Sequence, residues 1–131
     1  MAGFKLKVTP EMESLTQVCV ENSKMDPSLY GKYDVKRGLR DVNGKGVLAG
    51  LTQISSIYST DVVDGKTVPC EGRLYYRGYD IHELTQGFLR EQRFGFEEVT
   101  YLLLFGKLPN EKELADFKVL LAGQRSLPKN F

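Results

Sequence analysis

The segment EGRLYYRGYDIHEL, residues 71–84, gathers most of the side chains in this sequence that could do chemistry. It holds two arginines, three tyrosines, one aspartate and the only histidine of the chain, His82. Imidazole titrates near neutrality, so His82 could act as a general base. A base needs a positioned partner, however, and no serine or cysteine nucleophile motif accompanies it. We therefore expect His82 to have a surface or packing role, just inside a helix that begins at Asp80.

The same segment alternates basic and aromatic residues, a pattern that could stack nucleic acid bases. The alternating residues are Arg73, Tyr75, Arg77 and Tyr79. Eighteen basic side chains are balanced by 17 acidic ones, for a net charge of +1, so the attraction to phosphate that such a site needs is missing. The pattern of RNA-recognition motifs also breaks at Asp80. We predict a structural role instead, with half-buried tyrosines and with arginines paired to carboxylates or backbone carbonyls.

Other candidate groups also favour structural readings. GKGVLAG, residues 44–50, lacks the spacing of a phosphate-binding loop, and Lys45 is followed by glycine, so we expect a turn. Asp61 and Asp64 are expected in a turn because nothing places them across a shared substrate. The apolar run Leu102–Phe105 is expected in the core. A local basic run is predicted to be a solvated face: Lys32, Lys36, Arg37 and Arg40.

Composition sets further limits on the class of protein. The chain has 131 residues, the usual size of one domain, with 41% hydrophobic and 27% charged residues. Its longest apolar stretch is far too short to cross a bilayer, and its first residues lack the apolar region of a secretory signal. Cys19 and Cys70 lie far apart without metal-ligand spacing, which predicts a reduced, cytoplasmic protein without a metal site. We expect neither a nucleic acid nor a membrane partner.

Periodicity predicts a mainly α protein with a small β portion. Residues 9–38 form a helical lead segment, in which Thr9-Pro10 begins a helix that ends near Asn22–Ser23 and Asp26-Pro27 begins a short helical turn. Residues 39–79 are expected to be short strands and turns, because ten of the 13 glycines lie between Gly31 and Gly95. Asn43-Gly44 and Asp64-Gly65 favour tight hairpin turns. RLYY is the last predicted strand, which ends at Arg77 before a turn at Gly78.

Helices return over residues 80–131. Asp80 can cap a helix whose apolar stripe includes Ile81, Leu84, Phe88 and Leu89, with Glu83 three positions after the cap. A second helix, residues 96–105, is apolar on several sides and ends at Gly106, with Pro109 beyond it. Asn110 and Glu113 form a capping box for a third helix, and Pro128 marks the next break. The stripe of this third helix consists of Leu114, Phe117, Leu120 and Leu121.

Three segments together resemble one known family. GLRDVNGKGVLAGLTQIS, GRLYYRGYDIHEL and FGFEEVTYLLLFGKLPNEKEL, in this order, resemble the N-terminal region of citrate synthase. A leading DPSLYGKYDVKRGLRD segment is similar to clostridial-type bacterial sequences. The resemblance covers the chain from about residue 11 and implies that residues 1–131 are an N-terminal fragment of the citrate synthase fold.

The resemblance implies an acyltransferase of the tricarboxylic acid cycle that condenses acetyl-CoA with oxaloacetate to give citrate and CoA. The family is a mainly helical homodimer and uses no metal or prosthetic group; acetyl-CoA is its substrate. Two histidines and an aspartate do the chemistry, and all lie in motifs beyond LPNEKEL. His82 matches none of these positions. We therefore assign no catalytic, cofactor-binding or metal residue in this chain, and we expect the fragment to be inactive alone.

Two alternatives and one physical consequence follow from this resemblance. The chain could belong to a 2-methylcitrate synthase, since nothing in it discriminates the length of the acyl group. It could also be a stand-alone interaction or regulatory module derived from this region. Because helix 96–105 needs partners on several sides, the isolated chain is expected to expose a large apolar patch and to self-associate.

Overall fold

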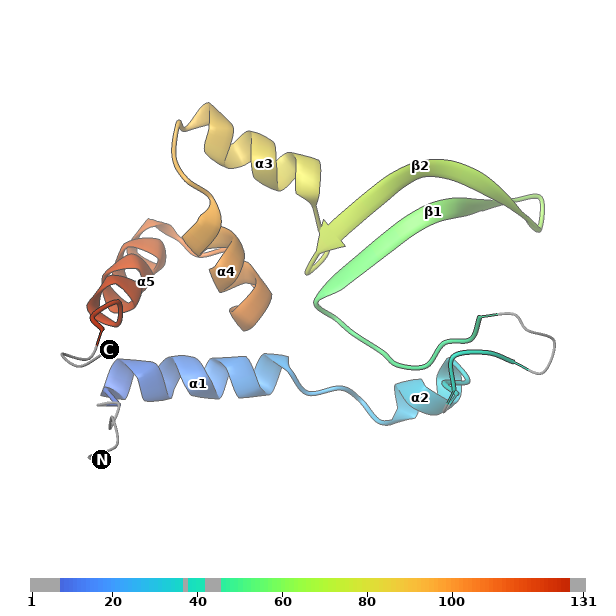
Figure 1. Cartoon of the computed structure of the whole chain (residues 1–131), viewed down its shortest axis with the longest axis horizontal. Helices are drawn as coiled ribbons and strands as arrows, with labels where there is room; N and C mark the ends of the chain where they lie inside the picture. Colours follow the sequence, from blue (N-terminus) through green and yellow to red (C-terminus); the bar gives the residue numbers. More distant parts are fainter. Residues whose placement is uncertain (1–7, 37, 42–45, 128–131) are drawn as a thin grey trace.

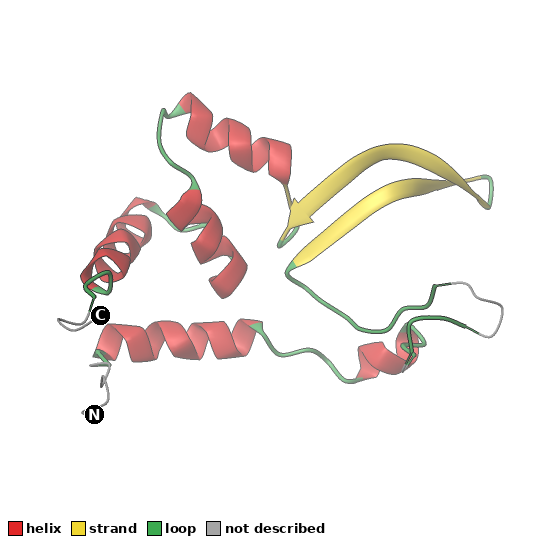
Figure 2. Ribbon diagram, in the orientation of Figure 1, coloured by secondary structure: helices red, strands yellow, loops and turns green. Residues whose placement is uncertain are grey.

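The computed structural model describes residues 8–36, 38–41 and 46–127. Helices dominate both ends of the chain, and a small antiparallel sheet lies between them (Figures 1 and 2). This architecture confirms the predicted mainly α class with a small β portion. The helices are α1 (Pro10–Asn22), α2 (Ser28–Lys32), α3 (Ile81–Arg90), α4 (Phe96–Phe105) and α5 (Glu111–Gly123). The strands are β1 (Ser55–Val63), β2 (Lys66–Tyr76) and β3 (Tyr79–Asp80), in the order β1-β2-β3.

The helical lead segment forms as its capping residues predict. Thr9 Oγ1 accepts a hydrogen bond from the backbone N–H of Met12 at 3.3 Å, and Pro10 occupies the first helical turn, where its missing N–H costs nothing. Asp26 Oδ1 accepts from the N–H of Ser28 at 2.9 Å at the start of α2. This bond to the Ser28 N–H also lowers the pKa of Asp26.

The middle of the chain is one long hairpin instead of the short strands that we predicted. Nine-residue β1 and eleven-residue β2 pair antiparallel and form a curved ribbon that reaches away from α4 and α5 (Figure 1). Its turn is the predicted Asp64-Gly65, with φ of 50° and 74°, the left-handed conformation that a two-residue hairpin turn requires. The other predicted turn, Asn43-Gly44, lies outside the described residues.

A bulge interrupts the ribbon between Tyr58 and Thr60. Tyr58 pairs with Arg73 and Thr60 pairs with Pro69, so the single residue Ser59 lies opposite Cys70, Glu71 and Gly72. The ladder therefore shifts by two residues between the turn and the base of the hairpin. Beyond the bulge, Ser55 pairs with Tyr76.

The junction from strand to helix differs from the prediction. β2 ends at Tyr76, and Arg77 and Gly78 form a tight turn with φ of 49° and 89°. This turn reverses the chain so that Tyr79 pairs with Tyr76 in the two-residue β3. Asp80 ends β3 and also caps α3, as predicted. Its Oδ1 accepts from the N–H of His82 at 2.7 Å, instead of from Glu83 as a capping box would require.

The core lies where α1, α4 and α5 meet. The rings of Tyr101, Phe105 and Phe117 contact one another edge-on, with centroids 4.5 to 5.8 Å apart. Leu102 of α4 is fully buried. The predicted core run Leu102–Phe105 is therefore correct at both ends. α1 and α5 supply the partly buried side chains around the rings: Leu15, Val18, Cys19, Leu120 and Leu121.

Two predicted apolar positions are not covered. Leu104 of α4 is 43% exposed, and Leu89 of the predicted α3 stripe is 58% exposed, although Leu84 of the same stripe is buried. Leu84 lies in the first half of α3, which follows directly on β3, whereas Leu89 lies near the other end of that helix. Periodicity identifies an apolar face, but a neighbouring element is needed to bury it.

Candidate functional site

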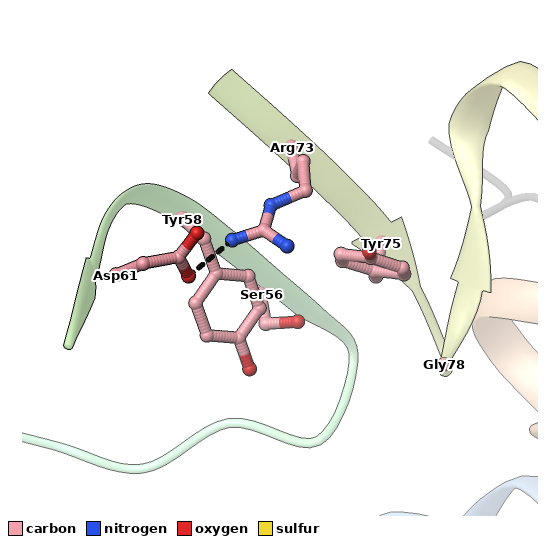
Figure 3. Close-up of a pocket in the computed structure, with 6 residues that line it drawn as sticks. All are labelled: Ser56, Tyr58, Asp61, Arg73, Tyr75 and Gly78. Atoms are coloured by element: carbon pink, nitrogen blue, oxygen red, sulfur yellow. Dashed lines mark hydrogen bonds and ion pairs between the residues drawn. The ribbon is translucent and has the colours of Figure 1, made fainter. Parts of the chain in front are cut away.

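A polar hollow lies on the hairpin, beside the bulge. Its volume is about 460 Å³, within the range of small-molecule sites. Figure 3 shows Arg73 and Asp61 pointing toward each other between the two strands, with two tyrosine rings beside them. The lining residues are Ser56, Tyr58 and Asp61 of β1, Arg73 and Tyr75 of β2, and Gly78.

Arg73 is the centre of this hollow. Its Nη2 donates to Asp61 Oδ1 at 2.5 Å and to Cys70 Sγ at 3.5 Å, and its Cζ lies 5.9 Å from the centroid of the Tyr58 ring. The hydrogen bond that Arg73 donates to Asp61 is the largest cause that raises the pKa of Arg73, followed by the bond to Cys70. Arg73 Nε is buried and makes no hydrogen bond within the part of the chain that the structure describes. The guanidinium therefore stays charged but is largely neutralised by Asp61.

The bulge brings Asp61 and Arg73 together, and sequence reasoning missed this pair. Asp61 was predicted in a turn, but it lies in β1, where it pairs with Arg73. An uninterrupted ladder from the Asp64-Gly65 turn would place Arg73 beyond Tyr58, and only the two-residue shift brings it back. Asp64 does occupy the turn, as predicted. The arrangement offers a cation, a carboxylate and three hydroxyl groups, but no nucleophile held by a base.

Arg77 is the second arginine of the 71–84 segment, and its contacts confirm the prediction that an arginine pairs with backbone carbonyls. Its Nε and Nη2 donate to the carbonyl of Leu103 at 3.2 and 3.0 Å, and its Nη1 donates to the carbonyl of Asn22 at 3.3 Å. Both carbonyls belong to the last turns of helices, α4 and α1 respectively, where they lack partners within the helix and the helix dipole is negative. One side chain thus joins the base of the hairpin to two helices.

The remaining residues of the 71–84 segment lie around these two arginines. Tyr75 and Tyr76 are half-buried as predicted, whereas Tyr79 is exposed. The Tyr58 and Tyr75 rings meet edge-on with centroids 5.9 Å apart. His82 is exposed in the first turn of α3, which is the surface position that the sequence predicts.

The predicted basic run shows no gathered binding surface within the described residues. Lys32, Lys36 and Arg40 are exposed, in agreement with a solvated face. Lys36 Nζ lies 2.6 Å from Asp34 Oδ2, and the hydrogen bond to Asp34 raises the pKa of Lys36. Arg37 and Lys45 lie outside the described residues.

Neither a metal centre nor a membrane helix is found in the described ranges. No group of three histidine, cysteine or carboxylate side chains is placed there to hold a metal ion. Cys19 and Cys70 are free and half-buried. No described helix combines the length and apolar character needed to span a membrane.

Comparison with known proteins establishes the family. The family model described as "Citrate synthase, C-terminal domain" matches residues 38–131. The chain therefore belongs to the citrate synthase family. That description names the C-terminal domain, so the predicted N-terminal placement is not confirmed by the match.

Individual relatives agree with this family. The chain is 45% identical over 56 residues to a 2-methylcitrate synthase of Shewanella oneidensis, covering 43% of this chain and 13% of that protein. It is 32% identical over 110 residues to a 2-methylcitrate synthase of Mycobacterium tuberculosis, covering 84% of this chain and 23% of that protein. It is also 35% identical over 85 residues to citrate synthase 2 of Bacillus subtilis, covering 65% of this chain and 18% of that protein. The chain thus spans less than a quarter of these relatives.

Proposed function

We propose that this chain is a structural part of a citrate synthase, an acyltransferase that condenses acetyl-CoA with oxaloacetate to give citrate and CoA. The family match over residues 38–131 carries this proposal. The proposed enzyme is a cytoplasmic homodimer of the tricarboxylic acid cycle, of the clostridial type. The 131 residues supply scaffold, and the reacting groups come from elsewhere in the longer protein.

The geometry of the described residues supports this division of roles. The hollow on the hairpin holds the guanidinium of Arg73, whose charge Asp61 neutralises. The guanidinium N–H groups of Arg77 donate to backbone carbonyls. His82, the only imidazole, is exposed, and its backbone N–H, not its ring, makes the contact with Asp80. Acid–base catalysis needs a group held against the proton that it moves.

An assay of CoA release tests whether the reacting groups lie outside these residues. The purified 131-residue chain is incubated with acetyl-CoA and oxaloacetate, and the free thiol of CoA is measured, with citrate synthase 2 of Bacillus subtilis as the positive control. We expect no release above the rate without protein. Turnover that scales with the concentration of the chain would overturn the scaffold proposal.

The N-terminal placement is a separate part of the proposal. It rests on the order of the three motifs that resemble the family and on the predicted division of the chain into a helical lead (9–38), strands and turns (39–79) and helices (80–131). Reading the coding sequence on both sides of these 131 codons tests it. Family motifs with the catalytic histidines and aspartate on the 3′ side are expected. The same motifs on the 5′ side would place the chain at the C-terminal end instead.

A 2-methylcitrate synthase is the second candidate, because two of the relatives described above carry that name. Acetyl-CoA and propionyl-CoA differ by one methylene group, which a pocket discriminates by roughly 10- to 200-fold. The ratio of kcat/KM for the two thioesters, measured on the full-length enzyme, decides between them. A stand-alone interaction module is not favoured over these enzymes. An uninterrupted reading frame that contains the catalytic motifs would rule out this alternative.

A further inference from the structure

The elements of the described structure pack into two units that meet at Arg77. α4 contacts α1 and α5, and side chains of these three helices surround the aromatic rings, so they make up one unit, the helical core. β1, β2 and β3, with the turn at Arg77 and Gly78, contact one another and α3, and together they make up the hairpin unit. Figure 1 shows the hairpin reaching away from the helical core, with α3 following its base. The orientation of one unit against the other therefore depends on the contacts at their junction.

The hydrogen bonds across this junction come from one side chain. Arg77 donates from Nε and Nη2 to the carbonyl of Leu103 at 3.2 and 3.0 Å, and from Nη1 to the carbonyl of Asn22 at 3.3 Å. Leu103 belongs to α4 and Asn22 is the last residue of α1, so both acceptors lie in the helical core. Among the described residues, no other hydrogen bond or ion pair joins the elements of the hairpin unit to the three core helices.

The backbone at Arg77 is strained, and its side-chain bonds oppose that strain. Arg77 and Gly78 have φ of 49° and 89°, as the central residues of a two-residue turn between Tyr76 and Tyr79. Such a turn favours asparagine, aspartate or glycine, because a longer side chain in the left-handed conformation costs free energy. Strain of this kind persists only where the surrounding structure fixes the residue. At Arg77 the backbone N–H bond to Ile54 and the guanidinium bonds supply that restraint.

The junction can open without unfolding either unit. The two carbonyls lie at helix ends, where water can replace the guanidinium as their partner. The units stay joined at the short connection 91–95, where Arg93 binds both Glu91 and Glu98. A few loop residues of this kind are enough to absorb the changes of φ and ψ in a hinge. The other connection, residues 23–54, is long enough to follow such a movement.

We infer that Arg77 is a latch that fixes the angle between the hairpin unit and the helical core. In the closed state, its guanidinium holds the base of the hairpin against the C-terminal ends of α1 and α4, where the helix dipoles attract its charge. In the open state, the hairpin unit swings as one body about the connection 91–95, and the packing inside each unit stays as it is. This conformational device stands apart from the proposed enzymatic role.

The distance between two nitroxide labels, measured by pulsed electron paramagnetic resonance, reports this angle. His82→Cys in α3 and Lys118→Cys in α5 place one label on each unit at exposed positions, in a background of Cys19→Ala and Cys70→Ser. The labelled chain is mixed with an excess of unlabelled chain, so that only the two labels of one molecule contribute. We expect a single narrow distance distribution as long as Arg77 is present.

Arg77→Asn opens the latch but keeps the turn, because asparagine suits the left-handed position and is too short to bridge the two carbonyls. We expect the distance distribution to widen by about twofold or more, because the hairpin unit then samples a range of angles. Circular dichroism confirms that the variant is folded. If the asparagine variant does not fold, Arg77→Lys takes its place, because a single ammonium cannot bridge both carbonyls either.

Arg73→Gln is the matched control. Arg73 is an arginine of the same hairpin, but its contacts with Asp61 and Tyr58 stay within the hairpin unit, so its loss should leave the width of the distribution unchanged. A narrow distribution in the folded Arg77 variant would overturn the inference. A broad distribution already in the chain with Arg77, or equal broadening by Arg73→Gln, would overturn it as well.

Discussion

At the residue scale, Arg77 connects the base of the hairpin with two helices, α1 and α4. Its guanidinium reaches the last turns of α1 and α4 at once, and its backbone N–H binds the carbonyl of Ile54. The planar fork of arginine can donate in two directions, whereas the lysine ammonium is a point charge on a flexible stem. The neighbouring Gly106 supports the same junction. A Cβ at this position would lie 2.8 Å from Asn22 Oδ1, so the ends of the two helices approach closely.

Replacing Arg77 tests this junction. Arg77→Lys keeps the charge but cannot reach both carbonyls, so we expect the free energy of unfolding to fall by about 2 kcal/mol, the scale of hydrogen bonds to a charged group. Urea unfolding followed by circular dichroism measures the change. Arg90→Lys, at an exposed position in α3, is the control and should change stability by less than about 0.5 kcal/mol. Equal effects of the two replacements would show that the three bonds of Arg77 add nothing to stability.

His82 gives a second prediction at this scale. Because its side chain is exposed and it matches no catalytic motif, His82→Ala in the full-length enzyme should leave kcat within a few-fold of the wild type. Steady-state CoA release with acetyl-CoA and oxaloacetate measures this. A loss of 10²-fold or more, the scale expected when a general acid or base is removed, would restore the catalytic reading of this histidine.

The contacts of the arginines show how far residue chemistry can be predicted from this sequence. The kind of partner was predictable for both Arg73 and Arg77, because a half-buried guanidinium needs a carboxylate or carbonyls. The identity of the partners was not. Asp61 meets Arg73 only because of the bulge, and Leu103 and Asn22 meet Arg77 only through the packing of two helices far away in sequence.

At the element scale, the capping box at the N-terminus of α5 allows a test of how much one local contact stabilises the fold. Asn110 Oδ1 accepts from the N–H of Glu113 at 2.9 Å, and Glu113 Oε2 accepts from the N–H of Asn110 at 2.9 Å. Asn110→Ala removes the first bond and should lower the free energy of unfolding by about 1 kcal/mol. Lys118→Ala, at an exposed position within the same helix, is the control and should be close to neutral. Thermal unfolding of both variants measures the difference, and a neutral Asn110→Ala would show that the capping box contributes nothing.

Glu113 makes the stability of α5 depend on pH. The hydrogen bond to Lys107 lowers the pKa of Glu113 most, and the backbone bond to Asn110 lowers it further. A carboxyl group whose pKa is lowered by folding stabilises the folded state above its unfolded pKa of about 4.3, and this contribution is lost as the pH falls through the folded pKa. Between pH 6 and pH 3 the wild type should therefore lose more stability than Glu113→Gln. Urea unfolding at a series of pH values measures this, and parallel losses in the two proteins would contradict the linkage.

Helix boundaries were predictable in this chain because local chemistry sets them. Thr9 at the start of α1, Gly106 with φ of 77° at the end of α4 and the Asn110 capping box all lie where the sequence predicts. The hairpin was not predictable in full, because the backbone pairing of a bulge leaves no pattern in side-chain types. β3 was missed because two residues give no periodicity.

At the scale of the whole molecule, the buried core and the hairpin occupy different parts of the described structure. Tyr101, Phe105 and Phe117 are buried among α1, α4 and α5, whereas all the residues of β1 from Ile57 onward are exposed. Stability within a protein follows buried apolar contacts, and regions with few such contacts open locally at little cost. We therefore expect the helical core and the tip of the hairpin to open as separate units.

Hydrogen exchange on Phe117→Ala tests this separation. Deleting a buried aromatic ring costs about 3 to 5 kcal/mol, so amides of α1, α4 and α5 should lose protection together. Val119→Ala is the control in the same helix, because Val119 is 73% exposed and its loss should change protection little. Amides at the tip of the hairpin, around Val62 and Thr67, should exchange fast in the wild type and equally fast in both variants, at concentrations where sedimentation shows a monomer. If their protection instead falls with that of the core, the hairpin and the helices form one cooperative unit, and the contacts of Arg77 are the route by which the core stabilises the ribbon.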